Sequence, residues 1–114
     1  MSDIILGNIK TVLGIEEDNL GFDHELLIHI NSAKSGLVQL DVTALDIVID
    51  ASTVLPDTGS TSLDALCVQY LGWKVKQAFD PSANASIASA LDKSLITLEG
   101  RIQYEVEEIE NAVP

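Results

Sequence analysis

Histidine and carboxylate residues near the start of the chain are the first candidates for metal binding. His24 and His29 lie five residues apart, whereas two histidines that share a metal ion on one helix lie four apart. No set of histidine, cysteine and carboxylate residues has the spacing of metal ligands. Asp23, His24 and Glu25 fit more simply as the cap and first turn of a helix. We therefore expect no metal site.

Nucleophilic residues and phosphate-binding motifs give no stronger signal. Ser60, Thr61 and Ser62 lie in a predicted loop, with no histidine close in sequence that would suggest a catalytic triad. The segment GNIKTVLG lacks the Lys-Ser/Thr pair of a phosphate-binding loop. Cys67 is the single cysteine and lies in an apolar run, which is typical of a small buried side chain. We expect no catalytic residue, no cofactor and no enzymatic activity.

The composition predicts one small, helical and strongly acidic domain. Of the 114 residues, 46% are hydrophobic and only 4% are aromatic, which favours a core of Leu, Ile, Val and Ala. The 18 acidic and 6 basic residues give a formal charge of −12, which argues against binding to nucleic acid or to an anionic membrane. No apolar run approaches the roughly 20 residues of a membrane span. The start, MSDIILGNIK, lacks the basic leader of a signal peptide, so we expect the chain to be made and kept in a cytosol.

Apolar periodicity predicts two helices in the first part of the chain. The first spans residues 2–14, with Ser2 as its candidate N-cap and Gly14 as its C-terminal stop. The second spans residues 23–40, with Asp23 as its N-cap.

A long connection over residues 41–60 follows the second helix. The segment LDIVID alternates apolar and polar side chains, which predicts a short strand over 45–49 with Leu45, Ile47 and Ile49 on one side. A connection of about 20 residues is long for a compact domain and is usually functional or flexible.

Residues 62–79 and 82–110 predict two long helices in an antiparallel hairpin. Every facing pair is apolar in the expected register: Phe79 with Ile87, Val75 with Leu91, Leu71 with Leu95, Cys67 with Leu98, and Leu63 with Ile102. The fold class is therefore all-α, a single bundle of about four helices.

The corner of this hairpin consists of Phe79, Asp80 and Pro81. Proline disfavours helical geometry in the residue before it, and it is favoured at the first position of a new helix. We expect the contact between Phe79 and Ile87 to close the hairpin at this end.

The far end of the last helix has no partner in this register. Val106 and Ile109 lie beyond the start of the third helix, in a run of glutamates. Either the first helix or another protein chain covers them. The glutamates form either a solvated face or an interaction surface.

Three other residues inside the long helices allow two interpretations each. Gly72 and Gly100 reflect either the close approach of a neighbouring helix or plain tolerance, because an interior glycine costs roughly 1 kcal/mol against alanine. Trp73 is either a core anchor against the second helix or an interface anchor, since tryptophan is favoured in binding hot spots.

The order of these segments resembles the small head–tail connector proteins, or head-completion adaptors, of tailed bacteriophages and prophages. The resemblance covers roughly residues 4–108. It rests on a short helix ending in LGI, the phrase FDHELLIHINSA, a long variable connection, a helix ending in WKVKQAFDPS, and a last helix with LITLEGRIQYEVEE. Its most specific part is the helix that runs into Phe79-Asp80-Pro81, followed by a helix with Arg101 near its leucine-rich middle.

The resemblance implies a non-enzymatic structural protein of the virion, located at the head–tail interface and synthesised in the host bacterial cytoplasm. Members of the family assemble as a ring beneath the portal protein and continue the DNA channel towards the tail. The implied partners are other copies of the chain, the portal protein, and a tail or stopper (head-closure) protein. DNA would pass through without specific binding, and no membrane would be involved.

A ring requires one patch of each protomer to meet a different patch of its neighbour. The candidate contact residues are Leu45, Ile47, Ile49, Val54, Leu55, Trp73, Val106 and Ile109. A negative channel wall would let DNA pass, because phosphate contacts would otherwise hold it. The alternative is a small acidic helical binding or inhibitor module, such as a DNA mimic, which the wide spread of the charges along the chain disfavours.

Overall fold

The computed structural model describes residues 4–79 and 84–112. These ranges contain α1 (Ile5–Leu13), α2 (Asp23–Gln39), α3 (Thr61–Phe79) and α4 (Ala85–Ala112), with a short 3₁₀ helix, η1 (Thr43–Leu45), between α2 and α3. The described residues include no β-strand. The prediction of an all-α fold with four helices and a long α2–α3 connection is confirmed.

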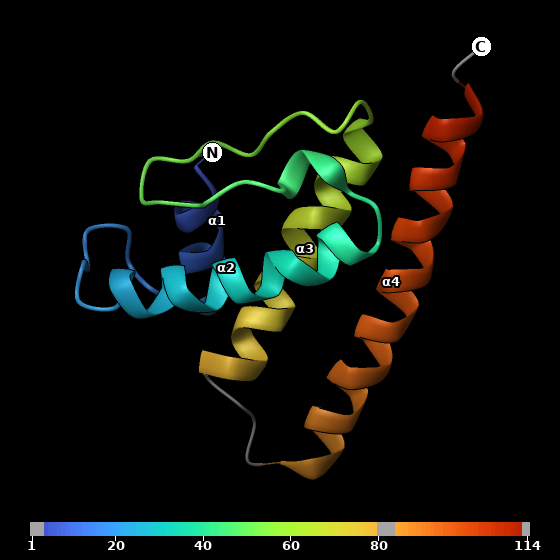
Figure 1. Ribbon diagram of the computed structural model, residues 1–114. Helices are drawn as coiled ribbons and strands as arrows, with labels where there is room; N and C mark the ends of the chain where they lie inside the picture. The colour runs from blue at the N-terminus through green and yellow to red at the C-terminus, as the bar shows by residue number, and fades with distance from the viewer. Residues whose placement is uncertain (1–3, 80–83, 113–114) are drawn as a thin grey trace.

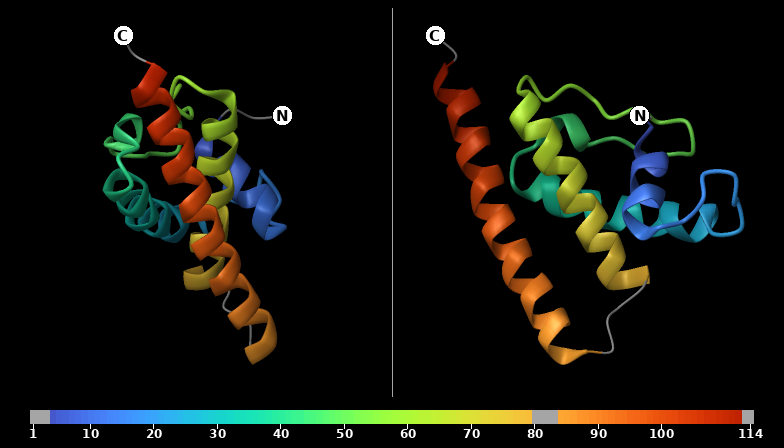
Figure 2. Two further views of the ribbon diagram at one scale, coloured as in Figure 1. Left: turned by 90° about the vertical axis from the view of Figure 1, so that its right-hand side faces the viewer. Right: turned by 180° about the vertical axis from the view of Figure 1, so that it is seen from behind.

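The central element is α3, against which α1, α2 and α4 all pack. Figures 1 and 2 show α1 and α2 on one flank of α3 and α4 on the other. Among the described helices, α4 contacts α3 alone. Because it is covered on two flanks, α3 buries residues around much of its circumference: Leu63, Leu66, Cys67, Tyr70, Leu71, Gly72 and Val75.

The seam between α3 and α4 is closed in its middle and open towards the corner. The residues that α4 buries are Leu95, Leu98, Ile102 and Val106, whereas Ile87 is 57% exposed. The predicted closing contact of Phe79 with Ile87 is therefore wrong. The Phe79 ring instead lies edge-on to Phe22, the N-cap residue of α2, with the ring centroids 5.3 Å apart, an arrangement that aromatic pairs favour. Asp80 and Pro81 lie outside the described residues.

Some helix ends lie where the sequence predicts them, and others do not. Gly14 ends α1 in the left-handed conformation, with φ 74°, which glycine adopts without strain. Asn84 immediately precedes α4, and its side-chain oxygen accepts a hydrogen bond of 2.9 Å from the Ser86 amide. The prediction that Asp23 caps α2 is wrong: Phe22 holds the N-cap position. Asp23 is the first helical residue, and its carboxylate forms an ion pair with Lys10.

The structure distinguishes the two helix-interior glycines. A Cβ at Gly72 would lie 3.2 Å from the Val12 side chain of α1, so a closely approaching helix explains this glycine. A Cβ at Gly100 would meet no atom of the described residues within 4 Å, so packing against them does not require a glycine there.

The predicted strand over residues 45–49 is wrong. Leu45 ends η1 and is fully buried, and the segment after it pairs with a side chain rather than with a strand. Asn31 of α2 donates to the Ile49 carbonyl at 2.8 Å, and its side-chain oxygen accepts from the Ile49 amide at 2.9 Å. The side-chain amide of Asn31 therefore satisfies the N–H and the C=O of Ile49, the two backbone groups that a neighbouring strand would have used.

Candidate assembly surfaces

The predicted contact residues differ in how far their side chains are buried. Leu45, Ile49 and Val106 belong to the core, with exposed fractions of 0%, 2% and 7%. Ile47 and Val54 are exposed on the α2–α3 connection. Trp73, Leu55 and Ile109 are half-buried. The structure therefore does not bring these residues together into one patch.

The far end of α4 is covered in part by the α2–α3 connection, and α1 does not contact α4. A hollow of about 360 Å³ separates this end from the connection. Its lining residues are Asp41, Val42, Thr43, Ala44, Thr58, Leu63, Val106, Ile109 and Glu110. Val106 thus has a covering segment within its own chain, while Ile109 keeps part of its side chain open to solvent.

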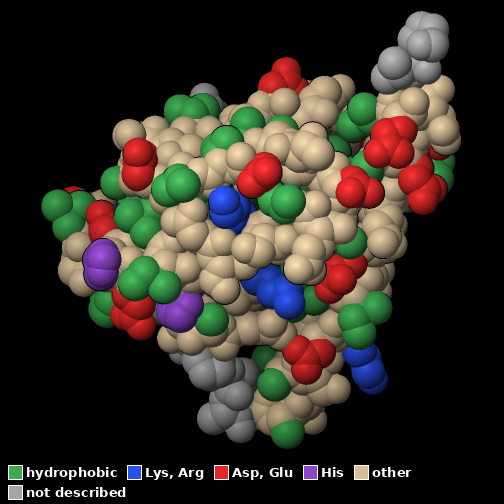
Figure 3. Space-filling view, in the orientation of Figure 1, with side chains coloured by type: hydrophobic (Ala, Val, Ile, Leu, Met, Phe, Trp, Pro, Cys, Tyr) green, Lys and Arg blue, Asp and Glu red, His purple; other side chains and the backbone are tan. Residues whose placement is uncertain are grey.

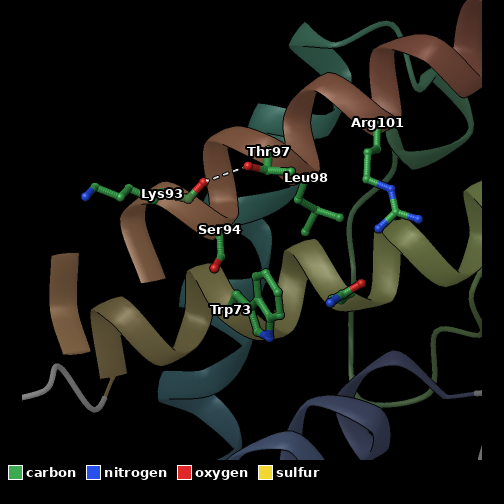
Figure 4. A pocket seen from close by; sticks show the side chains of 7 residues that line it. Trp73, Lys93, Ser94, Thr97, Leu98 and Arg101 are labelled. Atoms are coloured by element: carbon green, nitrogen blue, oxygen red, sulfur yellow. Dashed lines mark hydrogen bonds between the residues drawn. The ribbon is translucent and has the colours of Figure 1, made fainter. Parts of the chain in front are cut away.

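Trp73 is half-buried, packs against the core and lines a groove between α3 and α4 (Figure 4). The groove has a volume of about 260 Å³, and its lining residues are Gln69, Trp73, Lys93, Ser94, Thr97, Leu98 and Arg101. None of the described residues that line it carries a carboxylate. Figure 4 shows Arg101 reaching from α4 towards α3 at one end and Lys93 extending outwards at the other. An indole flanked by two cations is suited to an acidic partner that carries some apolar surface.

Sequence reasoning pointed to Arg101 through the family resemblance alone and did not connect it with Lys93. The spacing of residues 93, 97 and 101, four apart, could have shown that they share one edge of a helix. Nothing in the sequence alone identified the groove on α3 that this edge faces.

A second groove, of about 500 Å³, lies between α2, α3 and α4. Its lining includes His29, Gly36, Tyr70, Lys74 and Glu99. Burial raises the pKa of the Tyr70 phenol, which keeps it protonated at neutral pH. The Lys74 ammonium lies 5.8 Å from the centre of the Tyr70 ring, within reach of a cation–π interaction.

Lys10 is buried beneath the loop between α1 and α2. Its ammonium donates to the Glu17 carbonyl at 3.2 Å and to the Asn19 carbonyl at 3.0 Å. It also pairs with the Asp23 carboxylate at 2.5 Å. These three partners use all the donors of the ammonium, so Lys10 holds the acidic loop in place and offers nothing to a ligand.

Neither metal binding nor thiol chemistry has a site in the described residues. No three histidine, cysteine, aspartate or glutamate side chains among residues 4–79 and 84–112 are grouped so as to hold a metal ion. Cys67 is fully buried, and desolvation raises the pKa of its thiol to about 12, so the thiol is protonated and unreactive at neutral pH.

Negative charge gathers at the far end of α4. Glu107, Glu108 and Glu110 are exposed there, and Figure 3 shows acidic side chains over this end of the molecule. The exposed Tyr104 lies beside them, and the Glu108 carboxylate raises the pKa of its phenol. In the ribbon views this end of α4 projects beyond the start of α3 (Figures 1 and 2).

Comparison with known proteins assigns the chain to a family. No curated protein and no solved structure matches it. In the described part of the chain, none of the helices combines the length and the apolar character that crossing a bilayer requires. Residues 5–109 match the family described as phage connector protein. Because this match covers most of the sequence, the chain belongs to the phage connector protein family.

Proposed function

We propose that this protein is a structural component of the virion, a head–tail connector that forms an oligomeric ring under the portal protein and continues the DNA channel to the tail. The observation that carries this proposal is the family match over residues 5–109. Its partners are then other copies of itself, the portal protein and a tail or stopper protein, and its location is the head–tail interface of the virion.

The arrangement of α4 supports assembly into a ring. One side of α4 packs on α3, and the opposite side carries exposed residues along the length of the helix, among them Ile96 and Tyr104, at 70% and 61% exposure. Exposed apolar side chains of this kind are available for contact with another chain. Ile47 and Val54 add a second exposed apolar area on the connection.

The charge of the chain suits the passage of DNA. Protein cations bind DNA by neutralising its phosphates and releasing counterions. A formal charge of −12 leaves few cations for such contacts. DNA would therefore move along a wall of this protein without being held.

Assembly with the portal protein tests the proposal. The purified chain is mixed with purified portal protein, and complexes are examined by negative-stain electron microscopy and mass measurement. We expect a ring of this chain on the portal. A chain that stays monomeric at high concentration, and that the portal protein does not recruit, would contradict the proposal.

Two substitutions probe the exposed connection within the same assay. Val54→Asp places a charge in this predicted contact area and should reduce recruitment. Leu20→Asp is the matched control, because Leu20 is also an exposed apolar residue, at 70% against 55% for Val54, and lies on the loop between α1 and α2. If both variants assemble like the unmodified chain, the connection is not a contact surface.

A further inference from the structure

We propose that the groove beside Trp73 receives the acidic far end of α4 from a second copy of this chain. We call the first surface the Trp73 groove, and the second the α4 tip, defined as Tyr104, Glu107, Glu108 and Asn111. This inference rests on the proposed ring and names the contact that joins its neighbouring protomers.

The Trp73 groove holds two of the few cations of this acidic chain. Lys10 is fully used by its buried partners, and Lys34 donates to the Ile47 carbonyl. Lys93 and Arg101 are exposed and form no ion pair with any residue that the structure describes. They are eight residues apart, which separates their Cα atoms by roughly 12 Å along the helix. The groove therefore presents a cation near each end and Trp73 between them.

The α4 tip has the complementary chemistry. Its members lie at positions i, i+3, i+4 and i+7 of one helix, so they share one side of α4. Glu107 and Glu108 supply exposed carboxylates, and Tyr104 supplies an aromatic ring that is 61% exposed. The unsatisfied carbonyl groups at the C-terminal end of a helix add to the negative potential. Carboxylates would meet Lys93 and Arg101, and the tyrosine ring would meet the indole.

The geometry requires that the tip come from another copy. The groove edge and the tip lie on the same continuous helix, so the tip cannot turn back onto its own groove. Every copy has one groove and one tip, and a contact between two different patches propagates from protomer to protomer until a ring closes. The protomers of a closed ring lie at the same height along the ring axis. If α4 were parallel to that axis, each tip would lie level with the neighbouring tip. For a tip to reach the middle of the neighbouring α4, the helix must therefore be inclined to the axis.

Charge reversal is the first test, carried out with the full chain and portal protein. Arg101→Glu and Glu108→Arg should each abolish the ring, because each places like charges in contact, and the double variant should restore it. Lys34→Glu on α2 and Glu16→Arg on the loop between α1 and α2 are the charge-matched controls away from the two surfaces, and both should assemble normally.

Disulfide trapping is the second test. The positions of Thr97 in the groove and Glu108 in the tip are eleven residues apart, roughly 16 Å along one helix, which is too far for a bond within one chain. Oxidation of the variant Thr97→Cys with Glu108→Cys should therefore give a ladder of linked chains. The variant Thr97→Cys with Glu16→Cys should give no such ladder. Cys67 is buried and does not interfere.

The outcomes separate this contact from the ring itself. If the unmodified chain assembles and the reversed variants assemble equally well without a ladder, the contact is wrong while the connector ring stands. If the unmodified chain assembles neither alone nor on the portal, the proposed function fails and the contact with it. If Arg101→Glu leaves the ring intact but abolishes binding to a short DNA duplex in a fluorescence anisotropy assay, the groove contacts phosphates and the proposal is overturned.

Discussion

The hydroxyl group of Tyr70 fills the space that a side chain at position 36 would need. A Cβ built on Gly36 would overlap the Tyr70 hydroxyl oxygen and would lie 3.1 Å from the ring carbon that bears it. Gly36 belongs to α2 and Tyr70 to α3, so this pair sets how closely the two helices approach.

Gly36→Ala should lower the free energy of unfolding by about 1–3 kcal/mol, the usual cost of overpacking. The measurement is urea denaturation followed by circular dichroism. Gly100→Ala is the matched control: a methyl group there meets nothing, so helix propensity should raise stability by up to about 1 kcal/mol. In a Tyr70→Phe background, which removes the closest atom, Gly36→Ala should cost less. An equal cost in both backgrounds would contradict this explanation.

Lys10→Met should destabilise the fold by about 2–4 kcal/mol, because it leaves a carboxylate and two carbonyl groups without their donor. Lys93→Met, at an exposed position, should change stability by no more than about 0.5 kcal/mol. Proteolysis gives a local readout, since the loop over residues 15–22 should become the first cleavage site in the Lys10 variant. An unchanged cleavage pattern would show that Lys10 does not hold this loop.

Asn31→Asp should release the segment around Ile49. The carboxylate keeps an acceptor for the Ile49 amide but loses the donor to the Ile49 carbonyl, now faced by a negative charge. We expect a loss of about 1–3 kcal/mol and faster amide hydrogen exchange over residues 46–53. Gln39→Glu on the same helix, at an exposed position, is the control and should leave exchange there unchanged.

The Cys67 thiol should make stability depend on pH in the alkaline range. Its pKa is raised to about 12 in the folded chain, against about 8.5 in an unfolded one. Below pH 8 the thiol is protonated in both the folded and the unfolded state, so the folded state has its full stability. Above about pH 9 the unfolded state has lost the proton that the folded state retains, so the free energy of unfolding falls by up to about 1.4 kcal/mol per pH unit.

Urea denaturation between pH 7 and 9.5 measures this slope, and Cys67→Ala, which has no thiol, supplies the reference. The native protein should also resist alkylation at pH 8 until urea unfolds it. Equal slopes for the two proteins, or rapid alkylation of the native thiol, would show that Cys67 is not protected as described.

The helices could be predicted because their local signals and their burial agree. The spacing of Leu95, Leu98 and Ile102 on α4 matches the seam that the structure buries, and Gly14 ends α1 as its conformational freedom indicates. Periodicity works here because one side of each helix faces a single continuous core.

The connection could not be predicted in the same way, because its conformation depends on partners far away in sequence. Alternation over residues 45–49 indicated a strand, yet an amide from α2, 18 residues away, took the place of a neighbouring strand. Phe79 likewise found its ring partner in Phe22 and not in the residue nearest across the corner. The pattern of residues within a single segment gives no information about such contacts.

The same limit applied to the candidate surfaces. The apolar residues at the end of α4 were expected to be covered by the first helix or by another chain, but the α2–α3 connection lies across Val106. The Trp73 groove could not be predicted from one segment, because residues of two helices form it. Its cations, Lys93 and Arg101, lie on α4, whereas Gln69 and Trp73 lie on α3.

The packing of α4 against a single helix, α3, among those that the structure describes has a mechanical consequence. A force on the free end of a long helix that is packed along one side acts on that packing contact as a torque. In this protein the attachment is the row of buried side chains around Leu98 and Ile102. No helix other than α3 packs on α4 among the described helices, and only the α2–α3 connection lies against its far end. The tilt of α4 is therefore set, and resisted, at that row. In a ring, this one joint would determine how wide the opening is and how stiffly it responds to load.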